Sequence, residues 1–148
     1  MEFDKEFLGI LLEQAMENPR LRQNFDLRTS SADTSQRMLN ALQPGTEVPI
    51  HQHEKTAETV ICLVGKLEEI IYEEVNEYVH EATSCCDDVI RQKNFKEVSR
   101  QILSPAEGKF GIQIPAGAWH TINVIEPSVI FEAKDGAYNE YGNTTDKE

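Results

Sequence analysis

Residues 45–65 decide the fold, and they read GTEVPIHQHEKTAETVICLVG. His51 and His53 lie two positions apart, and side chains two apart on an extended strand point to the same face. Glu58 follows five residues after His53, close enough for a loop to bring its carboxylate back to the two imidazoles. We therefore expect this stretch to bring three metal-binding side chains to one point.

A fourth side chain of this kind comes from residues 115–120, PAGAWH, where His120 closely follows the turn signal of Pro115 and Gly117. Three imidazole nitrogens and one carboxylate oxygen suit Mn, Fe, Co, Ni, Cu or Zn better than Mg or Ca. The two histidines of residues 51–53 would, by themselves, also fit an exposed strand. Taken together, the set predicts one divalent transition metal ion (Fe, Mn, Ni, Co or Zn) bound by His51, His53, Glu58 and His120.

The spacing of these residues resembles the two sequence motifs of the cupin superfamily. The first motif runs Gly45, five residues, His51-Gln52-His53, four residues, Glu58, six residues, Gly65, and it matches at every defined position. The second keeps Pro115, Gly117 and His120, whereas Gly108 lies one residue farther from Pro115 than in the family pattern and Asn123 comes one residue early. The resemblance implies a cupin fold, a jelly-roll barrel or double-stranded β-helix, in which the four matching residues bind the metal.

A narrower resemblance covers most of the chain. Residues 18–22, 37–45, 114–121 and 131–136 look like the corresponding segments of WbuC-type cupin metalloproteins. Those proteins are associated with bacterial O-antigen and surface-polysaccharide gene clusters, and the family has no established reaction. The resemblance therefore implies a metalloprotein linked to polysaccharide biosynthesis without implying a mechanism.

The rest of the sequence predicts a mainly β chain that opens with one helix. Apolar residues recur every three or four positions from Phe3 to Met16, and Asn18-Pro19 then ends the pattern, as in an amphipathic helix. Short runs rich in β-branched residues, separated by turn residues, predict strands at 38–42, 59–64, 67–72, 95–103, 110–114, 121–125 and 129–133. So many short strands favour a barrel or sandwich over a parallel sheet with alternating helices.

The length of 148 residues fits one domain. We expect residues 1–20 to form the helix and pack on the barrel, residues 21–136 to form the cupin barrel, and residues 137–148 to run over the surface. Residues 75–94 carry several apolar side chains at partly helical spacing among acidic ones. This segment predicts a helical insertion between two strands.

The formal net charge of -12 argues against nucleic acid and anionic membranes as partners, because both bind clustered Lys and Arg. Acidic residues near Met1 do not fit the basic region of a secretory signal, and no apolar run reaches the roughly 18 residues of a membrane span. Cys62, Cys85 and Cys86 are odd in number, which disfavours a disulfide framework. We expect a cytoplasmic protein.

Several further residues have two interpretations each. Arg20, Arg37 and Lys134 are candidates for binding a substrate carboxylate or phosphate, although salt bridges with the surplus acids would explain them as well. Cys62 is expected to be a buried apolar residue rather than a metal thiolate, and His80 a solvated histidine. The pair Glu68-Glu69 is expected on a solvated strand face. No role is predicted for Cys85-Cys86.

Two functions remain open from the sequence. The first is a metal-dependent enzyme of the isomerase, epimerase or oxygenase type acting on a small polar molecule such as a sugar derivative, because four protein ligands leave two positions on a six-coordinate ion. The second is a non-catalytic module that binds a sugar or other metabolite, which a closed tetrahedral Zn site would favour. In either case a small-molecule ligand is expected, and exposed sheet edges make a homodimer plausible.

Overall fold

The computed structural model describes residues 1–83 and 86–136, with the side chains of residues 78–92 outside the description. The elements, in chain order, are α1 (Lys5–Glu17), β1 (Arg22–Asp26), β2 (Ser35–Leu42), β3 (Glu58–Thr83), β4 (Cys86–Leu103), the 3-10 helix η1 (Pro105–Glu107), β5 (Gly111–Ile114) and β6 (Trp119–Asp135). The predicted mainly β chain with one N-terminal α-helix is confirmed. Strand β1 was not predicted, because RQNFD at residues 22–26 lacks a β-branched residue.

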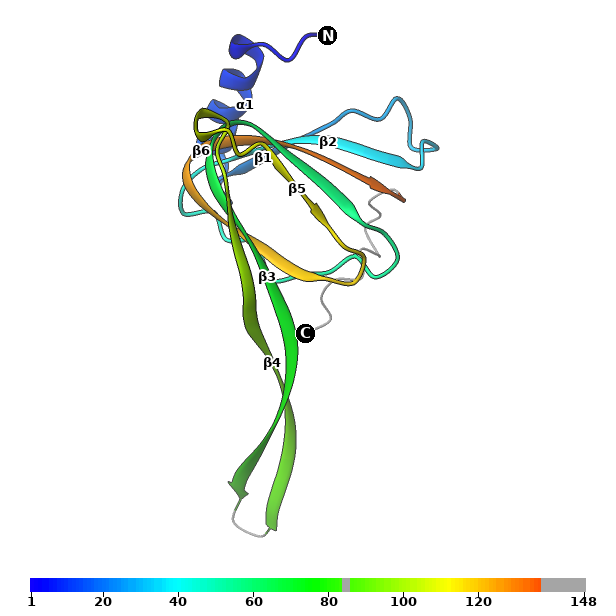
Figure 1. Ribbon diagram of the computed structural model, residues 1–148, viewed down its shortest axis with the longest axis vertical. Helices are drawn as coiled ribbons and strands as arrows, with labels where there is room; N and C mark the ends of the chain where they lie inside the picture. Colours follow the sequence, from blue (N-terminus) through cyan, green and yellow to red (C-terminus); the bar gives the residue numbers. More distant parts are fainter. Residues whose placement is uncertain (84–85, 137–148) are drawn as a thin grey trace.

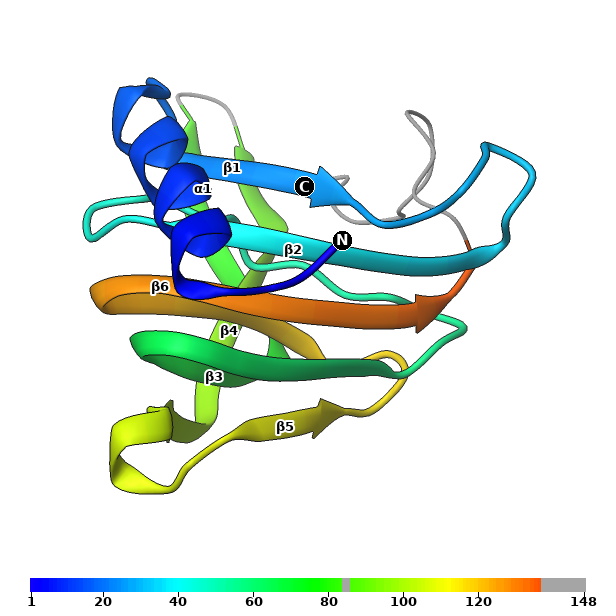
Figure 2. The ribbon, with the colours of Figure 1, turned by 90° about the horizontal axis from the view of Figure 1, so that it is seen from above.

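All of these strands pair antiparallel in one curled sheet. Their order is β1-β2-β6-β3-β4, with β5 pairing on β3. Figure 2 shows β1, β2, β6 and β3 side by side, with β5 beyond β3. The central strand β6 pairs with β2 through Leu39 and Phe131 and with β3 through Glu58 and Lys134. Segments from the beginning, middle and end of the chain thus meet in one sheet.

A sharp bend shared by β3 and β6 gives the sheet its curvature. The pairing of the two strands shifts register between Cys62 and Leu67. Gly65, inside that stretch, has a φ of 94°, and a Cβ added there would overlap the carbonyl oxygen of Pro127 on β6. Only glycine allows this approach. Because the strands continue through the bend, the predicted strand pairs 59–64/67–72 and 121–125/129–133 merge into β3 and β6.

Helix α1 covers the outer face of β2 and β6. The side chain of Asp4 accepts a hydrogen bond from the Phe7 amide and caps the helix. The apolar stripe of the helix packs against alternate residues of the two strands, and together they form one buried cluster: Leu8, Leu11, Ala15, Leu39, Ala41 and Val129. A second buried cluster lies across the sheet and consists of Leu42, Val60, Cys62, Leu67, Leu103, Ile114, Val124 and Ile130.

The sequence of β2, SQRMLNAL, explains how one strand serves both the core and the site. Leu39 and Ala41 face the helix, whereas Gln36, Met38 and Asn40 line a cavity on the opposite face. The alternation follows from the two-residue period of a strand. The inner face of β2 therefore carries two polar side chains, Gln36 and Asn40, beside the apolar Met38, which is unusual for a surface turned into the molecule.

The predicted helical insertion at residues 75–94 is wrong. The described residues of this segment, 75–83 and 86–94, belong to β3 and β4, which pair from Leu67 with Leu103 to Thr83 with Cys86. Figure 1 shows the two strands leaving the barrel as a long two-stranded arm. The segment contains Val75, Tyr78, Val79, Val89 and Ile90, and β-branched and aromatic residues favour strands over helices. The apolar residues only partly followed helical spacing, and the preference of β-branched and aromatic residues for strands outweighs that partial pattern.

Two earlier expectations concern parts of the chain outside the described residues: the course of residues 137–148 and the side chain of His80. Cys85 and the side chain of Cys86 also lie outside the description. Across the described part of the chain, no helix has the length and apolar character needed to span a membrane.

Candidate metal centre

The structure brings His51, His53, Glu58 and His120 together. One ligand atom from each residue can be chosen so that all four atoms lie within 4.8 Å of one another. His51 and His53 lie on the segment between β2 and β3. Glu58 is the first residue of β3, and His120 is the second residue of β6. Residues 69 positions apart in the sequence therefore share one site.

Backbone hydrogen bonds fix the two motifs against each other. His51 N donates to His120 O at 2.9 Å, and His120 N donates to His51 O at 2.8 Å. Gly117, with a φ of 79°, lies in the turn after Pro115 and donates its N–H to His53 O at 2.8 Å. The Pro-x-Gly turn thus holds the backbone of one predicted ligand while it leads into another.

The ring orientations of two histidines leave a nitrogen for a metal. His51 Nδ1 lies 2.9 Å from Pro49 O, and His120 Nδ1 lies 2.9 Å from Ala118 O. Since a carbonyl oxygen only accepts, each Nδ1 is the protonated nitrogen and each Nε2 carries the lone pair. This arrangement, in which one ring nitrogen donates to the protein and the other is available, is typical of metal-binding histidines.

The charges of the cluster also suit a cation. Burial, followed by the proximity of His120, lowers the pKa of His51 to about 4, so its imidazole is neutral at pH 7. Burial opposes ionisation of Glu58, but its interactions with the neighbouring His120 and His53 outweigh burial and hold its pKa well below the usual range. Glu58 Oε2 lies 2.7 Å from His53 Nε2 and 3.8 Å from His120 Nε2.

Two atoms of the cluster have no protein partner. His120 Nε2 and His53 Nδ1 are buried and unpaired in the described structure. Because an unpaired buried polar atom costs about 1–3 kcal/mol, His120 Nε2 is expected to have a partner that the protein does not supply. A neutral imidazole nitrogen facing an ionised carboxylate is the donor set that a divalent transition metal takes. The four residues could therefore hold such an ion.

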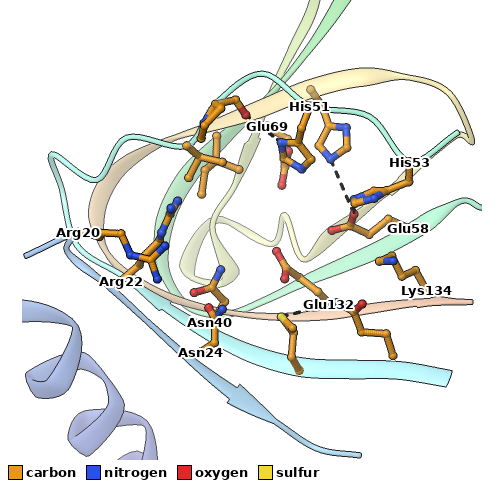
Figure 3. Close-up of a pocket in the computed structure, with 16 residues that line it drawn as sticks. Arg20, Arg22, Asn24, Asn40, His51, His53, Glu58, Glu69, Glu132 and Lys134 are labelled. Carbon is orange, nitrogen blue, oxygen red and sulfur yellow. Dashed lines mark hydrogen bonds and ion pairs between the residues drawn. The ribbon is translucent and has the colours of Figure 1, made fainter. Parts of the chain in front are cut away.

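The cluster opens into a cavity of about 510 Å³ on the inner side of the curled sheet. Figure 3 shows His51, His53 and Glu58 on one side and Arg20, Arg22, Asn24 and Asn40 on the other. The lining residues come from the loops and from β1, β2, β3 and β6: Arg20, Arg22, Asn24, Gln36, Met38, Asn40, Val48, Pro49, His51, His53, Glu58, Glu69, His120, Ile122, Glu132 and Lys134. The volume falls in the range of small-molecule sites.

The three cations predicted for substrate binding are placed differently. Arg20 and Lys134 line the cavity, whereas Arg37 does not. The Arg37 guanidinium instead pairs with Asp33 at 2.6 Å. The physical reason is the strand period, because Gln36 and Met38 on either side of Arg37 face the cavity. Lys134 is buried, and desolvation lowers its pKa.

Two carboxyl groups of the cavity were missed from the sequence. Glu69 was expected on a solvated face, but it is only 2% exposed and lines the cavity. Burial, with smaller effects of Glu58 and Glu132, raises its pKa well above the usual value. Burial and the charge of Glu58 raise the pKa of Glu132 to about 8. The available signal was a charged residue on the inner face of an otherwise apolar strand, as in VIFEAK at residues 129–134.

Cys62 lies away from the cluster, in the second buried core of the sheet. Burial raises the pKa of its thiol to about 11, so the thiol is neutral at physiological pH. This agrees with the expectation of a buried apolar residue and gives no support to a metal thiolate.

Solved structures with a similar fold include cupin-fold proteins of several kinds. The capsular polysaccharide assembling protein CapF from Staphylococcus aureus matches with a TM-score of 0.54 and 17% identity over 87% of this chain and 32% of its own. KdgF from Halomonas sp. matches with a TM-score of 0.53 and 15% identity over 82% of this chain and 84% of its own. Oxalate oxidase in complex with the substrate analogue glycolate matches with a TM-score of 0.52 and 12% identity over 80% of this chain and 53% of its own.

At these identities the likeness shows the fold alone, and it confirms the predicted cupin jelly roll. The chain spans about a third of the length of CapF. No curated protein sequence matches it. The family model of a domain of unknown function, DUF6016, matches residues 3–83, which include three of the four predicted ligands. Because that match covers more than half of the 148 residues, the chain belongs to the DUF6016 family.

Proposed function

We propose that the protein binds one divalent transition metal ion through His51, His53, Glu58 and His120. The observation that carries the proposal is the cluster itself, whose four ligand atoms lie within 4.8 Å of one another. Two further observations support it. His51 and His120 each hydrogen-bond a backbone carbonyl through Nδ1, and His120 Nε2 is buried without a partner in the described structure. The donor set fits Fe, Mn, Ni, Co or Zn.

The bound ion would serve a metal-dependent enzyme of the isomerase, epimerase or oxygenase type acting on a small polar metabolite. Such an ion supplies Lewis-acid activation of a substrate oxygen. The cavity of about 510 Å³ beside the cluster gives a substrate room to reach it. This open side favours the enzyme over a purely structural metal site, in which four ligands would close around the ion.

Glu69 and Glu132 are the proposed proton-transfer groups of such an enzyme. Both line the cavity, and burial raises the pKa of each above the usual value for a carboxyl group. The pKa of Glu132, about 8, lies near neutral pH, where a group can both take and return a proton. The sequence alone had offered no candidate for this role.

The metabolite is proposed to be a sugar derivative of surface-polysaccharide metabolism. This follows from the resemblance of residues 18–22, 37–45, 114–121 and 131–136 to WbuC-type cupins. The fold is also similar to that of a capsular polysaccharide assembling protein. The alternative function is a non-catalytic module in which the metal fixes a sugar or other metabolite.

Elemental analysis of the purified protein, with absorption and paramagnetic-resonance spectra of the bound ion, tests both candidates. Near-stoichiometric Fe, Mn, Co or Ni whose spectrum changes when sugar or keto-acid ligands are added would support an enzyme with open coordination positions. Stoichiometric Zn, studied as the Co-substituted protein and unchanged by every ligand, would favour the binding module. Failure to bind any metal after reconstitution would refute the proposal.

Substitution of single ligands locates the ion. His51→Ala and His120→Ala should each abolish stoichiometric metal binding, because three remaining donors hold a divalent ion far more weakly. Gln52→Ala is the matched control, since Gln52 lies between two predicted ligands but does not line the cavity. A His120→Ala protein that copurifies with a full equivalent of metal would contradict the four-ligand assignment.

A further inference from the structure

The buried polar side-chain atoms that lack a partner all lie on this one cavity. In residues 1–77 and 93–136 these atoms are Gln36 Oε1, Asn40 Oδ1, His53 Nδ1, Glu69 Oε2 and His120 Nε2. Every one of these residues lines the cavity. Two of the atoms belong to the proposed metal cluster, which leaves three on Gln36, Asn40 and Glu69. Since native proteins pair nearly all buried polar groups, this wall is complete only when a ligand or water occupies it.

The chemistry of those three groups favours hydroxyl-bearing ligands. A carboxyl oxygen and two amide groups can each form a hydrogen bond with a hydroxyl, which both donates and accepts. The amide groups fit a hydroxyl whichever end of each amide faces the cavity. An apolar ligand would leave Gln36, Asn40 and Glu69 unpaired at a cost of about 1–3 kcal/mol each. The wall therefore selects for a compound with several hydroxyl groups.

Two arginines occupy the side of the cavity opposite the proposed metal site, as Figure 3 shows. Arg22 Nη1 donates to Glu47 O at 3.3 Å, which holds its guanidinium at the cavity edge. Arg20 lines the same edge, and no carboxylate pairs with its guanidinium among the residues that the structure describes. In a chain with a net charge of -12, an arginine without a neighbouring acid at a cavity mouth is a recognition group for a carboxylate or phosphate.

The backbone between the two arginines is strained in a way that serves this placement. Leu21 has a φ of 57°, in the left-handed region that residues other than glycine seldom adopt. Leu21 N donates to Asn18 O at 2.8 Å, and Leu21 O accepts from Gln43 N at 2.9 Å. These bonds hold the strained turn, which brings both flanking guanidinium groups to the cavity. Strain of this kind, about 1–3 kcal/mol, persists where the surrounding structure fixes it and is concentrated at functional sites.

We propose that the cavity binds a hydroxyl-rich anion, a sugar acid or sugar phosphate, with its anionic group on Arg20 and Arg22 and its hydroxyl groups on Gln36, Asn40 and Glu69. The inference deepens the proposed function and rests on it only where the ligand reaches the metal. The contacts with Arg20 and Arg22 do not depend on the metal ion.

Isothermal titration calorimetry with four probes tests the ligand class: D-glucuronate, D-glucose 6-phosphate, D-glucose and hexanoate. Metal-loaded protein and chelator-treated protein are titrated side by side. The expected result is that at least one sugar anion binds about tenfold or more tightly than both D-glucose and hexanoate, because D-glucose loses the charge-assisted hydrogen bond and hexanoate leaves Gln36, Asn40 and Glu69 unpaired. Comparison of the two sugar anions then shows whether the site prefers a carboxylate or a phosphate.

Variants at the arginine end separate this inference from the metal proposal. Arg20→Gln should weaken binding of the favoured anion about tenfold or more while the metal content stays unchanged. Arg28→Gln is the matched control, because Arg28 pairs with Asp26 at 2.8 Å and does not line the cavity. Asn40→Leu, which keeps the size of the side chain, should weaken binding of the sugar anions and leave that of hexanoate unchanged.

Three results would overturn the inference. These are D-glucose binding as tightly as the more tightly bound of the two sugar anions, unchanged affinity for that anion in Arg20→Gln, and no heat of binding for any probe on metal-loaded protein. None of them bears on whether the four-ligand cluster holds an ion, which elemental analysis decides separately. Conversely, binding of a sugar anion that depends on Arg20 in chelator-treated protein would support the inference even if the cluster held no metal.

Discussion

Gly65 is the residue on which the bend of β3 and β6 depends. Its φ of 94° is accessible to glycine, and any Cβ would overlap the Pro127 carbonyl oxygen. We predict that Gly65→Ala lowers the free energy of unfolding by about 2–4 kcal/mol, from overpacking and left-handed strain together. Urea denaturation followed by circular dichroism measures the change.

The control for this substitution is Gly9→Ala, inside α1. A Cβ at residue 9 would meet nothing within 4 Å, and alanine favours a helix over glycine by about 1 kcal/mol. Gly9→Ala should therefore stabilise the protein slightly. Equal effects of the two substitutions would show that the bend does not require glycine.

Among single residues, those in close sequence motifs could be predicted and those placed by strand orientation could not. His51, His53 and Glu58 lie close together in the sequence, so local spacing suffices to group them. To place Arg37 and Glu69, one must know which face of each strand is turned toward the cavity. That depends on where the strand lies in the sheet. Arg37 faces away from the cavity and pairs with Asp33, as its salt-bridge interpretation has it, whereas Glu69 faces into the cavity, contrary to expectation.

The arm formed by the outer parts of β3 and β4 is the element that departs most from a plain barrel (Figure 1). In the described sheet, β4 pairs only with β3. The arm thus presents strand edges, to which the expected homodimer could pair. From the sequence, the acidic residues and partial helical spacing of the arm concealed an antiparallel pairing that its β-branched and aromatic residues favour.

The arm can be shortened at a known register. Asn76 pairs with Lys93, so replacing residues 77–92 by Asn-Gly should close a two-residue hairpin at that point. Because all described residues that line the cavity lie outside 77–92, we expect the metal content to stay unchanged and the melting temperature to move by only a few degrees. Loss of metal in the shortened protein would show that the arm supports the site.

For the whole molecule, metal binding and folding should be linked. The buried clusters on both faces of the sheet are apolar and need no ion, so we expect the metal-free protein to stay folded. A ligand that binds only the native state stabilises it by about 2.7 kcal/mol at a hundredfold excess over its Kd. Chelation should therefore lower the melting temperature by roughly 5–10 °C.

Differential scanning calorimetry before and after chelation, and again after metal is restored, measures this effect. His120→Ala should show no difference between the two conditions, because it lacks one of the proposed ligands. A melting temperature that is insensitive to metal in the unaltered protein, or equally sensitive in His120→Ala, would contradict the linkage.

The position of β6 between β2 and β3 has a consequence for biosynthesis. While the chain leaves the ribosome, β1 and β2 can pair early, and so can β3 and β4. Strand β6, the last strand in the described part of the chain, emerges after them and joins the two pairs. Until Trp119 to Asp135 is available, the apolar faces of both halves stay open to water and to other chains. A nascent chain that ended before β6 would carry three of the four predicted ligands and no closed barrel to hold them, so translational arrest before Trp119 would produce an aggregation-prone fragment instead of a weaker protein.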